Sequence, residues 1–311
     1  MKKALLLVEP KDEQMKALKA KFPTVEFTTD PDDYSDVEII LGWKVPLAKQ
    51  LLESKNLKWV QSRSAGVDYF PLKEFAERGI KLTTASGLHS RYIAETVAAY
   101  LLIENRGLRT VVKNPGVWDD PEVFETSEQT VLIFGTGNIG KEIARYCHFF
   151  EMKTIGVNRH GFDPKLATDF DEIITMDEFE AATTKYQVDY VINILPGTSY
   201  TNGFFNTKVL QKIEAGYSFI NVGRGSSVVT SDLEKLLAEN YVRSAYLDVF
   251  EQEPLDSDSA IWSSEQIIAT PHISGLMAHF KDIFIPLFED NLEKYLAGEK
   301  LHNLVDLDQG Y

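Results

Sequence analysis

The chain has 311 residues, of which 44% are hydrophobic, so it is long enough to bury a substantial core and to form two domains. Its formal net charge of −15 argues against a nucleic-acid partner, because binding to phosphates requires a basic surface. No apolar run is long enough to span a bilayer, and the short run at residues 4–8 is expected to be a strand rather than a signal peptide. The single cysteine, Cys147, excludes internal disulfides and indicates a cytoplasmic protein with a buried structural thiol.

Strand-like and helix-like segments alternate from the N-terminus. Strands are expected at residues 4–8, 25–28, 38–41, 57–62 and 80–84. Helices are expected at residues 13–21, 46–54 and 70–78, followed by a long amphipathic helix at 90–106. Such alternation predicts a parallel sheet with covering helices.

The alternation stops at Asn114-Pro115-Gly116 and resumes near residue 130. The later strands are expected at residues 131–134, 153–157, 188–195, 218–222, 245–249 and 267–269. The later helices are expected at residues 141–150, 177–185, 207–213, 231–240 and 279–297. Ser231 has the side chain of an N-cap at the start of its helix. The chain is therefore predicted to be an α/β protein with two parallel-sheet domains.

A Gly-x-Gly-x-x-Gly sequence, Gly135-Thr136-Gly137-Asn138-Ile139-Gly140, lies between an expected strand and an expected helix. In that setting Gly135 allows a tight turn, Gly137 lets the backbone approach a pyrophosphate, and Gly140 packs the helix against the strand. The helix N-terminus, with Asn138 and Ile139, would face the phosphates. The alternative is a purely structural glycine turn. The strand at 153–157, at the spacing of a βαβ unit, favours a dinucleotide site.

Three later segments each place a reactive side chain after a strand: Arg224 between two glycines, Glu253 before a proline, and His272 in Thr-Pro-His-Ile-Ser-Gly. An arginine can clamp a carboxylate or a carbonyl oxygen. A histidine beside a carboxylate can deliver a proton. Hydride transfer between a nicotinamide and a carbonyl needs these two functions. The structural alternatives are a surface ion pair for Arg224 and a turn residue at position 253, with Glu251 as the rival carboxylate.

Together with Ser62-Arg63-Ser64-Ala65-Gly66-Val67-Asp68, these motifs occur in the order and spacing of the D-isomer-specific 2-hydroxyacid dehydrogenases, which the chain resembles over nearly its whole length. The resemblance implies two Rossmann-like or flavodoxin-like parallel-sheet domains. A dinucleotide-binding domain, 101–284, would be inserted into a substrate-binding domain made of 1–100 and 285–311. The resemblance also implies a homodimer, with residues 106–118 as its arm.

The same resemblance implies roles for single residues. Arg224 would bind the carboxylate and carbonyl oxygen of a 2-oxoacid, His272 would be the general acid in its reduction, and Glu253 would orient His272 and favour its imidazolium. The backbone amides of Ala65, Gly66 and Val67 would bind the substrate carboxylate. Further cofactor contacts are expected at Pro196, Thr201, Val222 and Asp248, the last of which would face the nicotinamide carboxamide.

The residues after the second strand of the cofactor domain bear on the choice of dinucleotide. An NAD-specific protein has a carboxylate there that binds the ribose, but this chain has Asn158, Arg159 and His160. A guanidinium can pair with a 2′-phosphate, so the sequence favours NADP. Asp163 lies further along and keeps NAD open.

Two functions remain open at this point. The first is an NADP-dependent oxidoreductase that converts small 2-oxoacids to D-2-hydroxyacids. The second is a dinucleotide-binding regulator, like the corepressors of the same fold; the presence of Arg224, Glu253 and His272 favours the enzyme. No cluster of Cys, His and carboxylate side chains has metal-ligand spacing, so no metal is expected. His89 is expected either to begin a helix or to contact the substrate.

Overall fold

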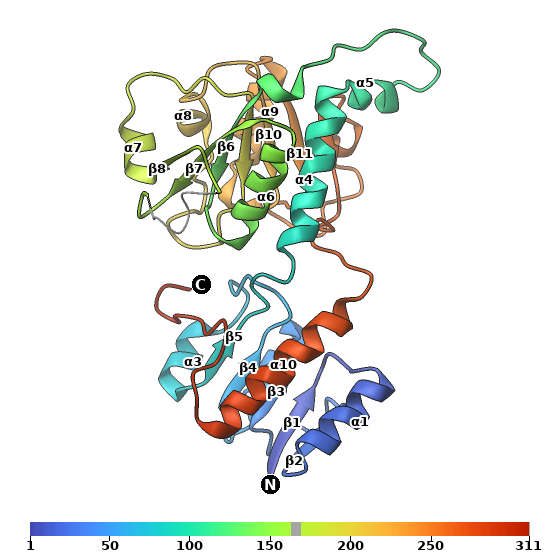
Figure 1. Cartoon of the computed structure of the whole chain (residues 1–311), viewed down its shortest axis with the longest axis vertical. Helices are drawn as coiled ribbons and strands as arrows, with labels where there is room; N and C mark the ends of the chain where they lie inside the picture. The colour runs from blue at the N-terminus through green and yellow to red at the C-terminus, as the bar shows by residue number, and fades with distance from the viewer. Residues whose placement is uncertain (163–168, 311) are drawn as a thin grey trace. The chain divides into compact units, whose positions relative to one another are not determined.

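The protein consists of two α/β units (Figure 1) in a computed structural model that describes residues 1–162 and 169–310. Unit 1 contains Met1–His89 and Met277–Tyr311, and unit 2 contains Ser90–Leu276. The fold class is confirmed, with one parallel-sheet unit inserted into the other. The units divide at different positions from the expected 100/101 and 284/285, because two long helices lie entirely in one unit each. Helix α4 (Ser90–Asn105) packs on the sheet of unit 2, and α10 (Phe280–Ala297) packs on that of unit 1.

Within the described residues, the sheet of unit 1 has the strand order β2-β1-β3-β4-β5, the order of flavodoxin-like folds. Its strands are β1 (Lys2–Leu6), β2 (Val25–Thr28), β3 (Ile39–Leu41), β4 (Trp59–Gln61) and β5 (Lys81–Thr83). Besides α10, its helices are α1 (Asp12–Lys21), α2 (Ala48–Leu51) and α3 (Leu72–Arg78). Successive strand residues join two different hydrophobic clusters, so both faces of the sheet are buried.

The sheet of unit 2 has the order β12-β11-β10-β9-β6-β7-β8 in the part of the chain that the structure describes. Its strands are β6 (Thr130–Phe134), β7 (Lys153–Asn158), β8 (Glu172–Thr175), β9 (Tyr190–Asn193), β10 (Tyr217–Asn221), β11 (Val242–Leu247) and β12 (Ile267–Ala269). Its other α-helices are α5 (Leu108–Lys113), α6 (Asn138–Phe149), α7 (Met176–Ala181), α8 (Thr207–Leu210) and α9 (Thr230–Ala238). Counted from β6, this is the doubly wound order of dinucleotide-binding folds, whose direction reverses between β6 and β9.

Most strands of unit 2 lie in the interior, as the continuous apolar runs of the sequence predict. Val131, Leu132, Ile133 and Phe134 are all 0% exposed. Alternate residues of β6 belong to the two hydrophobic clusters of the unit, one of which includes α4 and α6. Cys147 of α6 is fully buried, and burial raises the pKa of its thiol to about 12. The cysteine is therefore structural, as predicted.

Two elements of unit 2 were not expected from the sequence. Strand β8 lies at the edge of the sheet. Its residues are half-buried or exposed, so it lacks the run of buried apolar residues from which the other strands were predicted. Helix α5 contains no buried residue.

The predicted N-cap at Ser231 is wrong, because α9 begins at Thr230 and its N-cap is Val229. The Val229 amide donates to the Phe205 carbonyl at 3.0 Å, so the helix begins directly after this contact between segments.

A buried carboxylate ties α4 to the sheet of unit 2. Glu104 is 3% exposed and accepts hydrogen bonds from Arg109 Nε at 2.9 Å, Arg243 Nε at 3.1 Å and Tyr246 Oη at 2.6 Å. Burial by itself would raise the pKa of Glu104. The hydrogen bonds from Arg109 and Tyr246 and the two positive charges outweigh burial, so the pKa lies below its ordinary value.

We expect Glu104→Gln to destabilise the protein by about 3 kcal/mol at neutral pH, because it leaves two partly buried guanidinium groups uncompensated. A lowered folded-state pKa means that the carboxylate stabilises the fold above the unfolded-state pKa of about 4.3, and that this contribution is lost as the pH falls through the folded-state pKa. The difference in unfolding free energy between wild type and variant should therefore narrow below about pH 4. Urea unfolding at two pH values measures it, with the exposed Glu239→Gln as control. A difference that stays constant with pH would contradict this assignment.

Candidate active site

The first part of the candidate site is the glycine turn after β6, where the strand order of unit 2 reverses. Gly135 has φ +113°, a conformation that favours glycine, and its amide donates to the Val157 carbonyl at 2.9 Å. A Cβ atom on Gly140 would lie 2.0 Å from the Gly135 carbonyl oxygen, so the start of α6 can approach β6 only with glycine there. The tight turn and the close helix packing predicted from the sequence are confirmed.

Gly137 differs from the other two glycines. A Cβ atom added there would meet no atom within 4 Å, and its backbone is not left-handed. Protein packing therefore does not require glycine at this position. The residue precedes α6, whose first turn contains Asn138, Ile139 and Gly140 and directs its amides out of the helix N-terminus. Open space beside these amides fits a pyrophosphate group.

The loop after β7 is organised by Asn158, the last residue of the strand. Its Oδ1 accepts from the amides of His160 at 2.8 Å and Gly161 at 2.6 Å, and its Nδ2 donates to Thr136 Oγ1 at 2.9 Å. The side chain thus closes a turn and joins it to the glycine turn. Arg159 and His160 are exposed on this turn. Asp163, the acid that kept NAD open, lies outside the described residues.

The loop after β9 contains Pro196 and Thr201. Pro196 is exposed, whereas Thr201 is 5% exposed and its hydroxyl donates to the Pro196 carbonyl at 2.5 Å. Thr201 Oγ1 also accepts from the Thr198 amide at 3.0 Å. The hydroxyl of Thr201 therefore closes the loop, and the surface that this loop offers to a ligand comes from Pro196 and its neighbours.

Arg224 lies after β10 between two glycines that the packing requires. A Cβ atom on Gly225 would lie 1.9 Å from the backbone of Phe250, and one on Gly223 would lie 2.9 Å from the backbone of Ile194. The arginine segment therefore packs directly against the segment that contains Glu253. Arg224 is half-buried and its Nη1 donates to the Gly223 carbonyl at 2.9 Å, while the preceding Val222 is buried.

A buried network of side-chain amides holds the ends of β9 and β10. It was not predicted from the sequence. Asn193 Nδ2 donates to Asn221 Oδ1 at 2.9 Å and to Ser227 Oγ at 2.6 Å. Asn221 Nδ2 and Ser227 Oγ both donate to the carbonyl of Arg224, at 3.2 and 2.6 Å. The signal was present in the sequence, because β9 and β10 are apolar strands that each end in asparagine.

His272 and Glu253 form a hydrogen-bonded pair. His272 Nδ1 lies 2.7 Å from Glu253 Oε2, and the other carboxylate oxygen of Glu253 accepts the Phe250 amide at 3.0 Å. A carboxylate only accepts, so Nδ1 carries the proton and Nε2 is the ring atom that can gain or give one. The histidine side chain is 53% exposed. Glu253 therefore makes the contact for which Glu251 was the rival.

The backbone at His272 has φ +54°, a left-handed conformation that is uncommon for residues other than glycine. Asp248 holds the segment in this shape. Its carboxylate is 0% exposed and accepts from Thr270 Oγ1 at 2.6 Å and from the amides of Ile273 at 2.8 Å and Ser274 at 2.9 Å. The Asp248 carbonyl also accepts the His272 amide at 2.9 Å. Three protein donors thus occupy the side chain that was expected to face the nicotinamide.

The proposed carboxylate-binding amides belong to unit 1, in the loop after β4. Ala65 and Gly66 are half-exposed and Val67 is buried. The neighbouring Ser64 carbonyl accepts the Ala85 amide at 3.0 Å, which fixes the start of this segment. His89 Nε2 lies 3.2 Å from the Arg63 carbonyl oxygen, just before α4 begins. His89 therefore lies at the entry to α4, which is one of the two roles expected for it.

Two absences concern residues 1–162 and 169–310, the part of the chain that the structure describes. No helix among them is both long and apolar enough to cross a membrane. No group of three or more His, Cys, Asp and Glu side chains among them could hold a metal ion.

Comparison with known proteins identifies the family of the chain. The sequence profile described as "D-isomer specific 2-hydroxyacid dehydrogenase, NAD binding domain" matches residues 105–274. The glyoxylate/hydroxypyruvate reductase B of Escherichia coli is 29% identical over 283 residues, which is 88% of this chain and 86% of that protein. The glyoxylate reductase of Thermofilum pendens is 29% identical over 260 residues, which is 81% of this chain and 75% of that protein.

Solved structures give the same result. The NADPH-dependent glyoxylate/hydroxypyruvate reductase of Sinorhizobium meliloti, in complex with NADP and sulfate, is 26% identical, with a TM-score of 0.83 and 100% coverage of both chains. A D-isomer specific 2-hydroxyacid dehydrogenase family protein from Aeromonas salmonicida is 29% identical, with a TM-score of 0.84 and 99% coverage of both chains. The chain belongs to the D-isomer-specific 2-hydroxyacid dehydrogenase family and is an oxidoreductase that uses a nicotinamide dinucleotide.

Proposed function

We propose that the protein reduces small 2-oxoacids to D-2-hydroxyacids with NADPH. The observation that carries this proposal is the His272–Glu253 pair, whose 2.7 Å hydrogen bond leaves Nε2 of the imidazole to donate a proton. Arg224, on the neighbouring strand end, would bind the carboxylate and polarise the carbonyl oxygen. The amides of Ala65, Gly66 and Val67 would also bind the carboxylate.

The dinucleotide supplies the hydride when it is bound, and the protein supplies the proton and the charge that stabilise the developing alkoxide. In the direction of reduction His272 protonates the carbonyl oxygen, and in the reverse direction it removes the proton from the hydroxyl. Glu253 keeps the proton on Nδ1 and fixes the ring. The positive charge of Arg224 stabilises the negative charge that develops on the carbonyl oxygen.

The glycine turn offers a test of dinucleotide binding that separates ligand contact from folding. We expect Gly137→Ala to raise the Kd for NADPH at least about tenfold without a change in Tm, because the new methyl group would enter space that only a ligand uses. Gly140→Ala should instead destabilise the fold by about 1–3 kcal/mol, because its Cβ would overlap the Gly135 carbonyl. Fluorescence titration and thermal unfolding measure the two effects. Equal loss of stability in both variants would contradict this division of roles.

The proposed preference for NADPH rests on the exposed Arg159 after β7, with no acid in the adjoining turn of Asn158, Arg159 and His160. We expect Arg159→Asp to lower the ratio of kcat/KM with NADPH to that with NADH by about 10- to 100-fold, because a charge-assisted bond to the 2′-phosphate is lost. Lys153→Asp, at the opposite end of β7, makes the same change of charge and should leave the ratio unchanged. Equal or better use of NADH by the wild type would reject the NADPH preference.

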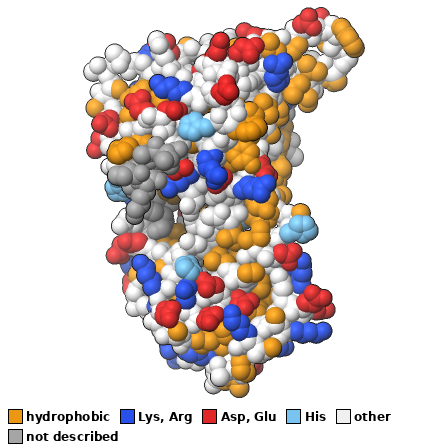
Figure 2. Space-filling model, viewed as in Figure 1, with side chains coloured by type: hydrophobic (Ala, Val, Ile, Leu, Met, Phe, Trp, Pro, Cys, Tyr) orange, Lys and Arg blue, Asp and Glu red, His pale blue; other side chains and the backbone are white. Residues whose placement is uncertain are grey.

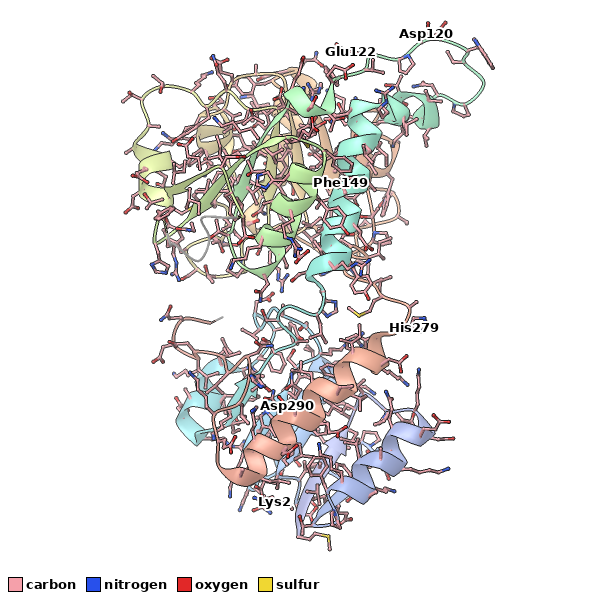
Figure 3. The ribbon with its side chains drawn as sticks, viewed as in Figure 1. Lys2, Asp120, Glu122, Phe149, His279 and Asp290 are labelled. Carbon is pink, nitrogen blue, oxygen red and sulfur yellow. The ribbon has the colours of Figure 1, made fainter. Side chains whose placement is uncertain are left out.

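We further propose a cytoplasmic homodimer that forms through α5 and the segment after it. Several apolar side chains there are exposed, including Val112 at 74% and Trp118 at 99%. Figure 2 shows hydrophobic side chains gathered on this part of unit 2, and Figure 3 labels Asp120 and Glu122 further along the same segment. Burial of these side chains against a second copy would be favourable. Sedimentation velocity should give the mass of a dimer.

A panel of 2-oxoacids with both cofactors tests the proposed activity. Glyoxylate, hydroxypyruvate, pyruvate and a branched 2-oxoacid are each mixed with NADPH or NADH, and the loss of reduced cofactor is followed by absorbance. At least one member should be reduced, and a chiral assay should identify the D-isomer of the chiral products. Binding of NADPH without turnover of any member would favour the regulator instead.

A further inference from the structure

The loop of residues 62–70 in unit 1 contains three hydroxyl groups that the steps above do not use. Tyr69 Oη lies 2.5 Å from Ser64 Oγ and 3.3 Å from Ser62 Oγ, and the two serine oxygens are 3.0 Å apart. Ser62 is 0% exposed, whereas Tyr69 is 37% exposed. The three groups form one hydroxyl cluster that reaches the surface at the tyrosine.

The direction of these hydrogen bonds follows from counting protons, because each hydroxyl has only one to donate. Ser64 Oγ donates to the Gly66 carbonyl at 3.0 Å, so in the contact between Ser64 and Tyr69 the tyrosine is the donor. Ser62 Oγ accepts the Ser64 amide at 3.1 Å and gives its proton to Ser64 or Tyr69. Each of the three protons has an acceptor within this loop, and when Ser62 donates to the nearer Ser64 oxygen at 3.0 Å, the phenolic oxygen of Tyr69 presents an acceptor to solvent.

The hydroxyl cluster is joined directly to the amides proposed to bind the substrate carboxylate. Ser64 precedes Ala65, and its hydroxyl bonds to the carbonyl of Gly66. The Tyr69 oxygen is thus two hydrogen bonds away from the backbone of that segment. In a 2-oxoacid the third carbon is two covalent bonds from the carboxylate carbon. A substituent on the third carbon would therefore lie close to the same loop.

We propose that Tyr69 selects 2-oxoacids with a hydroxyl group on the third carbon by accepting a hydrogen bond from that hydroxyl. This proposal rests on the proposed function. A substrate with a methyl group there would remove the acceptor oxygen from water without replacing its hydrogen bond, which costs free energy. Hydroxypyruvate is the smallest substrate of the favoured kind, and pyruvate is its methyl counterpart.

Steady-state kinetics of Tyr69→Phe with NADPH and three substrates test the proposal. Glyoxylate has no third carbon, so it reports on the carboxylate site and on catalysis alone. We expect kcat/KM for hydroxypyruvate to fall about tenfold, the value for pyruvate to rise because its methyl group no longer covers an unpaired oxygen, and the value for glyoxylate to change less than about twofold. The matched control is Tyr34→Phe, which removes a hydroxyl of unit 1 that donates to Glu53 at 3.0 Å. Its three values should equal those of the wild type.

The possible results separate the two proposals. An equal loss with all three substrates would show that Tyr69 only holds the loop, and an unchanged ratio of hydroxypyruvate to pyruvate would show that it does not select; either result overturns the role of Tyr69. Reduction of glyoxylate by the wild type tests the proposed function separately. If the wild type reduces none of the three substrates, the proposed function fails and the selection by Tyr69 fails with it.

Discussion

Replacement of His272 by asparagine is expected to lower kcat for 2-oxoacid reduction by a factor of about 10²–10⁴, because it removes the proposed proton donor. Asparagine is the informative substitution here. The residue has φ +54°, and asparagine adopts this conformation more readily than most other residues do. The loop should therefore keep its shape, and the Kd for NADPH should remain within about twofold of the wild-type value. Single-turnover kinetics with saturating NADPH, beside a fluorescence titration, measure both quantities.

Two matched substitutions, one at Glu253 and one at the nearby Glu251, test the role of the carboxylate that bonds to His272. Glu253→Gln keeps an oxygen that can accept from His272 Nδ1 but removes the negative charge beside the ring, so a loss smaller than that of His272→Asn is expected. Glu251→Gln changes an exposed carboxylate two residues earlier and should leave kcat unchanged. If His272→Asn retained most of the wild-type kcat, the proton would have to come from elsewhere and the proposed mechanism would fail.

The features that the sequence predicted well are local ones. The strand, the glycine turn and the helix of residues 130–149 lie together in the chain, so the spacing of Gly135 and Gly140 was enough to predict the turn and the close packing that the structure shows. The apolar runs predicted buried strands for the same reason. Half-exposed elements such as β8 were missed, because a strand with little apolar burial has no periodic signal.

The features that the sequence could not predict are contacts between distant segments. Asn193 bonds to Asn221 and Ser227, which are 28 and 34 residues away, and Tyr100 bonds to Thr270 across 170 residues. The asparagines that end β9 and β10 can be picked out from the sequence, but the residues around each of them do not identify its partner. The boundary between the two units at Ser90 was not predicted, because α4 is one continuous amphipathic helix and its whole length packs on unit 2. Which sheet a helix covers depends on tertiary packing.

Asp248→Asn is expected to lower kcat/KM at least about tenfold and to destabilise the fold by about 1–3 kcal/mol, because one buried donor would lose its acceptor. Oδ1 of Asp248 has two donors, Thr270 Oγ1 and the Ile273 amide, while Oδ2 has only the Ser274 amide. In the best orientation of the asparagine, its NH₂ group faces the Ser274 amide, and two donors oppose each other. The loop on either side of His272 would then shift away from Glu253. Urea unfolding and steady-state kinetics measure the two effects.

Tyr100→Phe is the control for this loop. Since Thr270 Oγ1 donates its proton to Asp248, the Tyr100 hydroxyl must be the donor in its 2.7 Å contact with Thr270. Removal of that hydroxyl leaves every donor of the carboxylate in place, so its effect on kcat/KM should be smaller than that of Asp248→Asn. A different pattern of effects on kcat/KM and on the unfolding free energy would favour a contact between Asp248 and the nicotinamide carboxamide, which the family resemblance implies. In that case Asp248→Asn would raise the Kd for NADPH and leave the unfolding free energy unchanged. The two measurements therefore decide whether Asp248 acts on the cofactor or on the backbone that positions His272.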